Sequence, residues 1–206
     1  MRDRRRFQHL VIFARRPHFG VGKRRLAVQV GELAAWRFQR FAVAALIHRF
    51  SRDPRWTTWV SATPDRSTRW VRPARPIAQG PGDLGERLQR LTRTLKPGAL
   101  VVIGSDAPQV SRDDVAAAFR TLGRVDAVFG PSPDGGYWLV GLGPKARLAR
   151  PFDNVRWSTE QALSDTVANL GHLRVGYLRE LEDVDDAAGL RRLGSGAAAG
   201  RRSAAL

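Results

Sequence analysis

The sequence predicts an α/β protein in three layers, with helices on both faces of a mostly parallel sheet. Short apolar runs such as 9–14 (HLVIFA) and 99–103 (ALVVI) are typical of strands that are buried on both faces. Segments with apolar residues at helical spacing lie between these runs, so strands and helices alternate along the chain. Because parallel strands need long crossover connections, which are usually helices, this alternation favours a parallel sheet.

The first half of the chain is predicted to alternate in this way from its start. Apolar residues recur at helical spacing through 24–50, with Leu33 and Phe41 on the expected apolar face and Gly31 as the point where the segment divides into two helices. The other expected elements are a strand at 56–64, a short extended piece from residue 72, a helix from about Asp83 and a strand at 99–106.

The second half is predicted to continue the alternation. Ser111 precedes a helical pattern and Asp114 follows three residues later, which is the spacing of an N-terminal capping box. The expected elements are helices at 111–122, 158–171 (capped by Ser158 or Thr159 and ended by Gly171) and 183–194, and strands at 126–131, 135–143 and 173–181.

Length and composition limit the class of protein. The 206 residues predict one domain over 1–194, followed by a small basic tail at 195–206 that is expected to be disordered. The chain has no cysteine, which excludes disulfides and thiolate metal sites. No apolar run approaches the roughly 20 residues that cross a bilayer, and the apolar stretch near the start is too short for a signal peptide. We therefore expect a cytoplasmic protein.

Positive charge is concentrated in the first 75 residues, which hold 18 Lys and Arg against 4 Asp and Glu, whereas the rest of the chain holds 17 against 15. A basic half of this kind is typical of proteins that bind an anion, such as a nucleotide, a phosphorylated substrate, nucleic acid or a membrane surface. Only three of the 35 basic residues are lysine. This arginine bias equally favours a solvated basic surface that serves solubility.

The loop between the first strand and the first helix combines glycines with basic residues. Gly20 and Gly22 allow the backbone to approach a ligand closely, and Lys23, Arg24 and Arg25 stand near the start of a helix. This pattern favours a site for a diphosphate or triphosphate. The spacing excludes a Walker A loop, which would need a hydroxyl where Arg24 stands. A flexible loop with surface arginines is the alternative interpretation.

Carboxylates stand at the carboxyl ends of two predicted strands, where ligands bind in sheets of this kind. Asp106 follows the buried strand 99–103, and Asp183, Asp185 and Asp186 crowd a later strand end. Oxygen ligands at such positions favour Mg²⁺, which usually brings phosphates with it. Turn capping by Asp106 and stabilisation of a helix dipole by the other three are the structural alternatives.

A third strand end carries the turn signal Asp134, Gly135 and Gly136. An ordinary hairpin is the structural alternative here. Because the segment follows the predicted strand 126–131, we expect it to lie beside Asp106, with the two glycines leaving room for a sugar or acyl substrate. Acidic or glycine-rich segments at three strand ends together predict a metal–phosphate site.

Six short motifs, taken in order, carry a resemblance to a known family. They are PHFGVGKRRLA (17–27), GPGDLGERL (80–88), GSDAP (104–108), DGGYWLVGL (134–142), WST (157–159) and DVDDAAGL (183–190). Over residues 8–192 the chain resembles a bacterial family of uncharacterised proteins with the glycosyltransferase-A fold. That family is similar to 2-phospho-L-lactate guanylyltransferase within the nucleotide-diphospho-sugar transferase superfamily.

The resemblance implies a nucleotide-binding transferase domain of the glycosyltransferase-A type and roles for the matching residues. Lys23 and Arg25 would contact nucleotide phosphates and, with Asp106, carry catalysis, while Asp106 and Asp185 would hold Mg²⁺ or Mn²⁺. The resemblance also implies nucleotide-binding residues Gly20, Gly22, Gly80, Asp83 and Gly85, and an acceptor side formed by Asp134, Gly135 and Gly136. The family usually has threonine where Arg24 stands, and this departure alters the expected phosphate contacts.

The function expected from these residues is Mg²⁺-dependent nucleotidyl transfer from a nucleoside triphosphate to a small phosphorylated acceptor, because a lysine and an arginine in the first loop suit a triphosphate. Glycosyl transfer from a nucleotide sugar is the first alternative. A non-catalytic protein that binds nucleic acid or senses a nucleotide is the second. Against nucleic-acid binding, no recognised motif is present, and Trp36, Trp56 and Trp59 occupy expected core positions.

Overall fold

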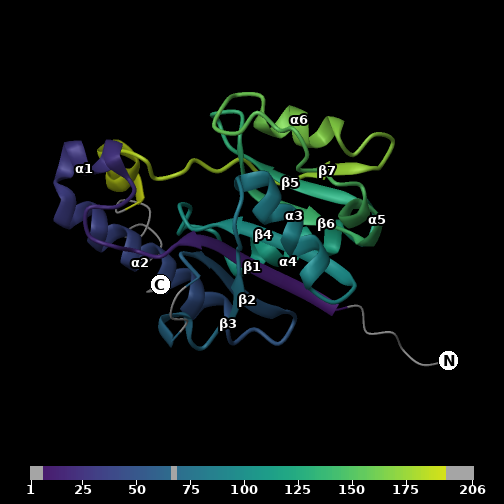
Figure 1. Ribbon diagram of the computed structural model, residues 1–206, viewed down its shortest axis with the longest axis horizontal. Helices are drawn as coiled ribbons and strands as arrows, with labels where there is room; N and C mark the ends of the chain where they lie inside the picture. The colour runs from purple at the N-terminus through teal and green to yellow at the C-terminus, as the bar shows by residue number, and fades with distance from the viewer. Residues whose placement is uncertain (1–6, 66–68, 194–206) are drawn as a thin grey trace, which may run out of the picture.

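A seven-stranded sheet forms the middle layer of the protein (Figure 1). The structure, a computed structural model, describes residues 7–65 and 69–193. The strand order across the sheet is β3-β2-β1-β4-β6-β5-β7. The strands are β1 (Phe7–Arg15), β2 (Thr57–Thr63), β3 (Arg75–Ala78), β4 (Gly98–Gly104), β5 (Ala127–Pro131), β6 (Tyr137–Leu142) and β7 (Val175–Tyr177). Helices cover both faces, so the predicted three-layer α/β architecture is confirmed.

One strand of the sheet runs against its neighbours. β1, β2, β3 and β4 pair in parallel, and so do β5 and β7, whereas β6 is antiparallel to both β4 and β5. The short loop 132–136 joins β5 and β6 into a hairpin. The segment that contains Asp134 is therefore the turn of a hairpin, as one of the two interpretations predicted. Since β5 and β4 point the same way, the loop still lies at the edge of the sheet where β4 ends.

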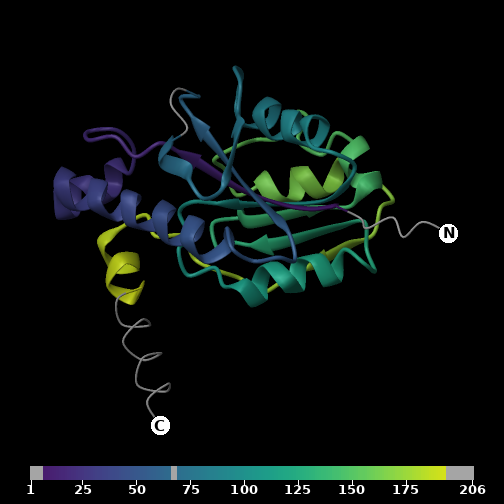
Figure 2. The same ribbon diagram turned by 90° about the horizontal axis from the view of Figure 1, so that it is seen from below.

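Two groups of helices cover opposite faces of the sheet (Figure 2). α2 and α4 pack on the face that receives Leu10 and Ile12, whereas α3, α5 and α6 cover the face that receives Val11. Successive residues of β1 point to opposite faces because side chains alternate along a strand. The helices are α1 (Arg24–Val30), α2 (Glu32–Phe50), α3 (Leu84–Thr94), α4 (Arg112–Thr121), α5 (Pro144–Leu148) and α6 (Ala162–Ala168), with a 3-10 turn η1 (Arg69–Val71).

Local sequence signals start several of these helices at the predicted places. Gly31 separates α1 from α2. The Ser111 side chain accepts a hydrogen bond from the backbone N–H of Asp114, and the Asp114 side chain accepts one from the backbone N–H of Ser111. Asp83 and Glu86 form the same reciprocal pair at the start of α3. Each pair satisfies two backbone donors that a helix start otherwise leaves without partners.

The second half of the chain departs from the prediction around α6. The helix expected at 158–171 is shorter, and neither Ser158 nor Thr159 caps it, because its N-cap position is Gln161. The Thr159 hydroxyl instead accepts from the backbone N–H of Gln161 within the preceding turn. β7 is also shorter than the expected strand. The sequence does not predict α5, because five residues are too few for a helical period to show.

The C-terminal part of the described chain packs against the α1–α2 pair (Figure 1). Residues 187–193 are helical. Val184, just before them, joins Leu26 of α1 and Phe38 of α2 in a small apolar cluster. This contact brings the acidic segment before the helix to the loop that precedes α1, although the two lie at opposite ends of the sequence.

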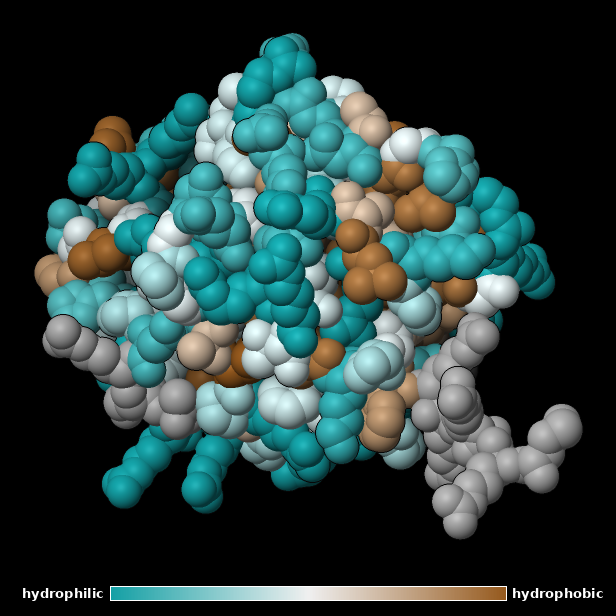
Figure 3. Space-filling view, turned by 45° about the vertical axis from the view of Figure 1, so that its right-hand side comes forward, coloured by the Kyte–Doolittle hydropathy of each residue, from teal (hydrophilic) through white to brown (hydrophobic). Residues whose placement is uncertain are grey.

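Hydrophilic side chains predominate on the face of the molecule in Figure 3, where apolar residues form small separate patches. Leu33 and Phe41, assigned by periodicity to the apolar face of α2, are 47% and 60% exposed, so this prediction is wrong. The α1–α2 pair projects beyond the sheet, so part of α2 does not pack on it. Among the described residues, no helix is long and apolar enough to span a bilayer. The expected tail at 195–206 lies outside the described residues.

Candidate active site

Two adjoining cavities open at the carboxyl ends of β1 and β4. The first has a volume of about 680 Å³, and the second, which extends toward β5 and β6, has a volume of about 990 Å³. The residues that line both cavities are Phe13, Arg25, Leu84, Gly104, Asp106 and Asp185. The two cavities therefore form one continuous cleft at the edge where ligands bind to parallel sheets.

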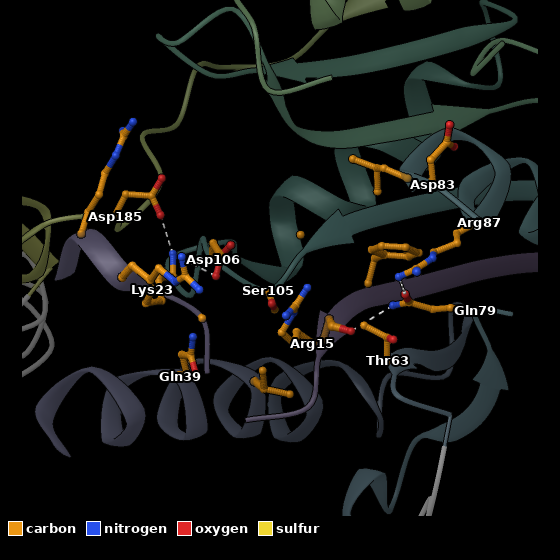
Figure 4. A pocket seen from close by; sticks show the side chains of 18 of the residues that line it. Arg15, Lys23, Gln39, Thr63, Gln79, Asp83, Arg87, Ser105, Asp106 and Asp185 are labelled. Atoms are coloured by element: carbon orange, nitrogen blue, oxygen red, sulfur yellow. Dashed lines mark hydrogen bonds and ion pairs between the residues drawn. The ribbon is translucent and has the colours of Figure 1, made fainter. Parts of the chain in front are cut away.

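At one end of the first cavity, the side chain of Lys23 contacts two segments that are distant from it in the sequence, one at Asp106 and one at 184–185 (Figure 4). Its Nζ lies 3.0 Å from Oδ1 of Asp106 and 2.6 Å from Oδ1 of Asp185, and it donates a 2.8 Å hydrogen bond to the carbonyl of Val184. The Lys23 side chain is 6% exposed, whereas the Asp106 and Asp185 side chains are 49% and 57% exposed. The two aspartates thus converge on one point and keep part of their surface open to the cavity.

Burial and neighbouring charges shift two pKa values in this group. Burial alone would lower the pKa of Lys23, but attraction to Asp106 and Asp185 outweighs it and raises that pKa above its ordinary value. Burial raises the pKa of Asp183 to about 7, and repulsion by the carboxylates of Asp106 and Asp185 contributes to this shift. The carboxylates therefore still repel one another in the presence of Lys23, and additional positive charge would be favourable there.

Backbone geometry holds the two sides of this group together. Lys23 is the N-cap residue of α1, and its φ of 47° lies in the left-handed region, as does the φ of 84° at Gly22. These two residues turn the chain sharply between the loop and the helix. On the other side, the backbone N–H of Val184 donates to the carbonyl of Asp106 at 3.2 Å. This bond fixes the acidic segment against the residues that follow β4.

The other end of the first cavity contains groups that sequence reasoning missed. Gln79, which is buried just after β3, donates from Nε2 to the carbonyls of Ala14 at 2.9 Å and Ser61 at 2.8 Å. Arg87 approaches the Oε1 atom of Gln79 at 3.5 Å. A signal for Arg87 was present, because it lies one helical turn after the predicted helix start at Asp83.

Basic side chains predominate in the first cavity. Its basic residues are Arg15, Lys23, Arg24, Arg25 and Arg87, and its acidic residues are Asp83, Asp106 and Asp185. Figure 4 shows an elongated arrangement, with Lys23 at one end and the Gln79–Arg87 pair at the other. A ligand that filled the cavity would meet Lys23 and two carboxylates at one end, and Arg87 together with Gln79 at the other.

The second cavity differs in being acidic and aromatic. Its acidic residues are Asp106, Asp134, Glu160, Asp183 and Asp185, and its basic residue is Arg25. Tyr137 and Trp157 form an aromatic wall, with ring centroids 6.4 Å apart and ring planes at 66°. Sequence reasoning did not single out Glu160, which no motif marks. Trp157 was included in the family resemblance and among the six tryptophans considered for stacking on nucleic acid.

The hairpin loop 132–136 packs closely against the segment before α6. A Cβ at Gly135, where φ is 79°, would clash with the backbone of Glu160. The Asp134 side chain accepts a 3.0 Å hydrogen bond from the backbone N–H of Gly136. Asp134 and Gly136 line the second cavity, whereas Gly135 permits the close approach of Glu160. Their assignment to an acceptor side stays a prediction.

The expected nucleotide-binding residues divide between the first cavity and its surroundings. Gly22 and Asp83 line the first cavity. Gly20 lines a smaller neighbouring cavity. Gly80, whose backbone N–H donates to the side chain of Asp65 at 3.0 Å, is not among the residues that line either part of the cleft.

Gly85 has a packing role that the sequence does not predict. It lies buried in the first turn of α3, and a Cβ there would come within 2.5 Å of the carbonyl oxygen of Phe152 and 3.0 Å of Nε1 of Trp157. Gly85 does not line either cavity. This glycine therefore lets α3 approach the segment that carries Trp157, and its expected contact with a nucleotide stays a prediction.

Asp106 and Asp185 fit a divalent cation that is bound together with phosphate. Mg²⁺ in proteins is usually held by one or two carboxylates with phosphate oxygens and waters, and these two carboxylates already surround one cationic atom. Within residues 7–65 and 69–193, no group of three or more His, Cys, Asp or Glu side chains is arranged to hold a metal ion. Two carboxylates alone would not fill the coordination of Mg²⁺, so phosphate oxygens and waters would have to supply the other ligands.

Solved structures with the same architecture include several transferases. A protein of Desulfovibrio desulfuricans G20, provisionally described as a nucleotide-diphospho-sugar transferase, matches with a TM-score of 0.82 and 27% identity, over 90% of this chain and 85% of its own. A CMP:2-keto-3-deoxy-manno-octonic acid synthetase complexed with CTP matches with a TM-score of 0.60 and 11% identity, over 94% and 99%. The 4-diphosphocytidyl-2C-methyl-D-erythritol synthase of Anaerococcus prevotii DSM 20548 matches with a TM-score of 0.58 and 8% identity, over 89% and 94%.

These similarities confirm the expected fold, that of the nucleotide-diphospho-sugar transferases, and the expected transferase class at the level of the fold family. No curated protein matches the chain. A family's sequence pattern matches residues 46–159, more than half of the chain, and this segment includes Asp106 and the loop 132–136. The chain therefore belongs to the family described as "Uncharacterized protein conserved in bacteria (DUF2064)".

Proposed function

We propose that the protein transfers a nucleotidyl group from a nucleoside triphosphate to a small acceptor, with Mg²⁺ as cofactor. The observation that supports this proposal is the convergence of Lys23, Asp106 and Asp185 at one end of a basic cavity. Five basic side chains around about 680 Å³ suit an anionic ligand of nucleotide size.

In the proposed complex the phosphates lie at the Lys23 end of the first cavity and the base lies at the Gln79 end. Lys23 and the neighbouring Arg24 and Arg25 supply positive charge at the first end. At the other end, Gln79 binds the carbonyls of β1 and β2 and so holds the strand ends in a fixed arrangement. The phosphates would then lie beside the second cavity, where an acceptor can reach them.

The chemistry follows from this placement. Asp106 and Asp185 would hold Mg²⁺, which when bound neutralises charge on the phosphate oxygens. Lys23 exchanges its carboxylate contacts for phosphate contacts, and with Arg25 it stabilises the negative charge that grows on the leaving group. An acceptor oxygen bonds to the α-phosphorus, and pyrophosphate leaves. Rate enhancement then comes from positioning and electrostatic stabilisation.

Glycosyl transfer from a nucleotide sugar is a second candidate that one observation favours. The Desulfovibrio protein, with a TM-score of 0.82, is described as a nucleotide-diphospho-sugar transferase. The two reactions release different products from the nucleotide. Pyrophosphate from a nucleoside triphosphate supports nucleotidyl transfer, whereas a nucleoside diphosphate from a nucleotide sugar supports glycosyl transfer.

Two of the six tryptophans are too deeply buried to stack on single-stranded nucleic acid, whereas Trp36 and Trp59, expected in the core, are only partly buried. Trp56 is 7% exposed and stacks on Phe119 in the core, with ring centroids 5.7 Å apart. Trp138 is 2% exposed. Aromatic side chains that stack on bases must be accessible, so these two residues cannot serve that role.

A thermal-shift panel tests the proposed function. Nucleoside triphosphates and nucleotide sugars are added with and without Mg²⁺, since a ligand of the native state raises the melting temperature. We expect at least one nucleotide to raise it in a Mg²⁺-dependent manner, and Asp106→Asn to abolish the Mg²⁺ dependence. Asp113→Asn, an exposed position in the first turn of α4, is the matched control. Equal stabilisation with and without Mg²⁺, or an unaffected Asp106→Asn variant, would contradict the proposal.

A further inference from the structure

The second cavity has a charge opposite to that of the protein as a whole. The chain carries a formal net charge of +16, yet five carboxylate-bearing residues line this cavity and Arg25 is its basic residue. Arg25 also lines the first cavity, so it stands at the border between the two. Asp134, Glu160 and Asp183 line the second cavity but not the first. Besides Asp106 and Asp185, which Lys23 contacts, the second cavity thus has three further acids in its lining.

Such a cavity disfavours an anionic acceptor. A phosphate monoester carries between one and two negative charges at neutral pH, and the carboxylates that line the cavity would repel it in a site partly shielded from water. Hydroxyl and ammonium groups have the opposite property, because they donate hydrogen bonds that carboxylate oxygens accept. The charge of the cavity therefore selects for hydrogen-bond donors.

The aromatic wall favours a compact ligand with a partly apolar surface. Tyr137 and Trp157 are only partly buried, and Leu84 and Leu88 line the same cavity. Aromatic side chains combine an apolar ring with a face that attracts positive charge. A ring or short carbon frame that carries hydroxyl or ammonium groups would match both this wall and the carboxylates around it.

Ser132 provides an observation that is independent of the acidic residues. It lines the second cavity and is 6% exposed. Its Oγ has no hydrogen-bond partner within the described part of the chain. A buried hydroxyl without a partner is unfavourable, and a polar ligand that reached this depth would supply the missing hydrogen bond.

We propose that the acceptor is a small hydroxyl-bearing molecule without an anionic group, such as a sugar, an amino sugar or an amino alcohol. This inference rests on the proposed function, because it names the acceptor of that transfer, and it replaces the phosphorylated acceptor expected from the sequence. The acceptor's hydroxyl oxygen bonds to the α-phosphorus, the bond from that phosphorus to the leaving pyrophosphate breaks, and the hydroxyl proton passes to a carboxylate of the cavity. With a nucleotide sugar, the same oxygen bonds to the anomeric carbon and a nucleoside diphosphate leaves.

Matched acceptors test the inference by turnover. Release of pyrophosphate or nucleoside diphosphate is measured with the full chain, Mg²⁺ and the most stabilising nucleotide, in the presence of glucose, glucosamine or glucose 6-phosphate, and of the same series built on mannose. We expect the neutral or amino member of a series to give a rate at least tenfold above that of its phosphate. Glu160→Lys is expected to lower this preference at least tenfold. A faster rate with the phosphate in the unmodified chain would overturn the proposal.

Fluorescence quenching tests the charge of the cavity without any need for turnover. The difference in fluorescence between the unmodified chain and Trp157→Phe gives the emission of Trp157, one of the six tryptophans. Iodide, caesium and acrylamide serve as anionic, cationic and neutral quenchers. We expect caesium and acrylamide to quench Trp157 several-fold more efficiently than iodide, and the Asp134→Asn/Glu160→Gln double variant to narrow that difference. Trp36, which lies against Arg40 outside the cleft, is the matched control and should favour iodide. If iodide quenches Trp157 as well as acrylamide does, the proposal is wrong, whichever acceptors react.

The acceptor inference and the proposed function fail in different ways. Nucleotide-induced stabilisation depends on the first cavity, so its absence would contradict the proposed function while the quenching result still stands. Nucleotide binding combined with preference for a phosphorylated acceptor, or with efficient quenching of Trp157 by iodide, would contradict the acceptor inference alone.

Discussion

The two cavities of the cleft share one edge of the sheet and two aspartates, yet they differ in charge. Five basic residues line the first cavity and one basic residue lines the second, while three and five acidic residues line them respectively. The first cavity obtains its cations from the end of β1, from Lys23 and the start of α1, and from α3. The second obtains its acids from the segment after β4, from the loop 132–136, from Glu160 and from the 183–185 segment. The sheet edge is shared, and the segments around it decide the charge of each cavity.

This difference shows that net charge is a poor guide to local charge. The basic first half of the sequence suggests an anionic partner, and the first cavity agrees with that suggestion. The same reasoning led to a phosphorylated acceptor, which would have to enter the acidic half of the cleft. Electrostatic interactions decline with distance and are screened by salt over roughly 10 Å, so the side chains that line a cavity outweigh the charge of the rest of the surface.

The largest expected effect comes from Lys23, the cation that the two shared aspartates surround. Lys23→Met keeps the length of the side chain and removes its charge. Because one preorganised group that stabilises transition-state charge typically contributes about 10²–10³ in rate, we expect kcat/KM for transfer to fall by about that factor. Lys145→Met, at an exposed position of α5, should leave it unchanged. If kcat/KM fell by less than tenfold in Lys23→Met, the proposed catalytic role of this residue would be wrong.

Gly135→Ala tests how much the close packing of the hairpin loop against Glu160 stabilises the fold. The added Cβ would meet the backbone of Glu160 at a residue with positive φ, so we expect the free energy of unfolding in urea to fall by about 2–4 kcal/mol. Gly171→Ala is the control, since φ is 59° but nothing lies within 4 Å, and it should lose only about 1 kcal/mol. If both variants lost the same free energy of unfolding, the contact with Glu160 would not contribute to stability.

Arg25→Gln tests the basic residue that both cavities share. The side chain is exposed, and one charged hydrogen bond to a phosphate in such a position is expected to contribute about 1.4 kcal/mol. We therefore expect nucleotide affinity, measured by calorimetry, to fall about tenfold, with a weaker dependence on salt. Arg37→Gln, at an exposed position of α2 outside the cleft, should change neither. An unchanged affinity for Arg25→Gln would mean that the first cavity binds phosphates without it.

The smallest expected effect concerns the ion pair between Arg179 and Asp114, which connects the segment before residues 183–186 to the start of α4. Arg179 donates to both carboxylate oxygens of Asp114, at 2.7 and 2.8 Å. Burial would raise the pKa of Asp114, but hydrogen bonds from Arg179 and Ser111 outweigh it and hold that pKa below its ordinary value. The pair therefore stabilises the fold at neutral pH, and its contribution is lost as the pH falls through the lowered pKa.

We accordingly expect Arg179→Gln to lower the free energy of unfolding at pH 7 by less than about 1 kcal/mol, because the arginine is 54% exposed. The difference from the unmodified chain should shrink as the pH is lowered below about 4. Urea denaturation at several pH values measures it. A difference that grew on acidification would mean that Asp114 and Arg179 do not form this pair.

Much of the fold follows from local patterns in the sequence. The run of apolar residues predicted β4, and the spacing of Ser111 and Asp114 predicted the capping box of α4, because both depend on residues close together in the chain. Patterns failed where local signals are short or misleading: α5 is too brief to show a period, and Ser158 and Thr159 serve a turn rather than a cap. Gly85 matched a binding motif but has a packing role that its contacts with Phe152 and Trp157 explain.

The sequence by itself determined the α/β class, most of the helices and strands, and the residue types of the candidate site, because backbone propensity and the alternation of apolar residues act over a few positions. Only the tertiary structure decided that β6 runs antiparallel, that Asp106 and Asp185 meet at Lys23, and that the cleft has a basic and an acidic half. These features arise from contacts between segments far apart in the chain. Such contacts depend on how the helices and strands pack together, and no local pattern encodes them.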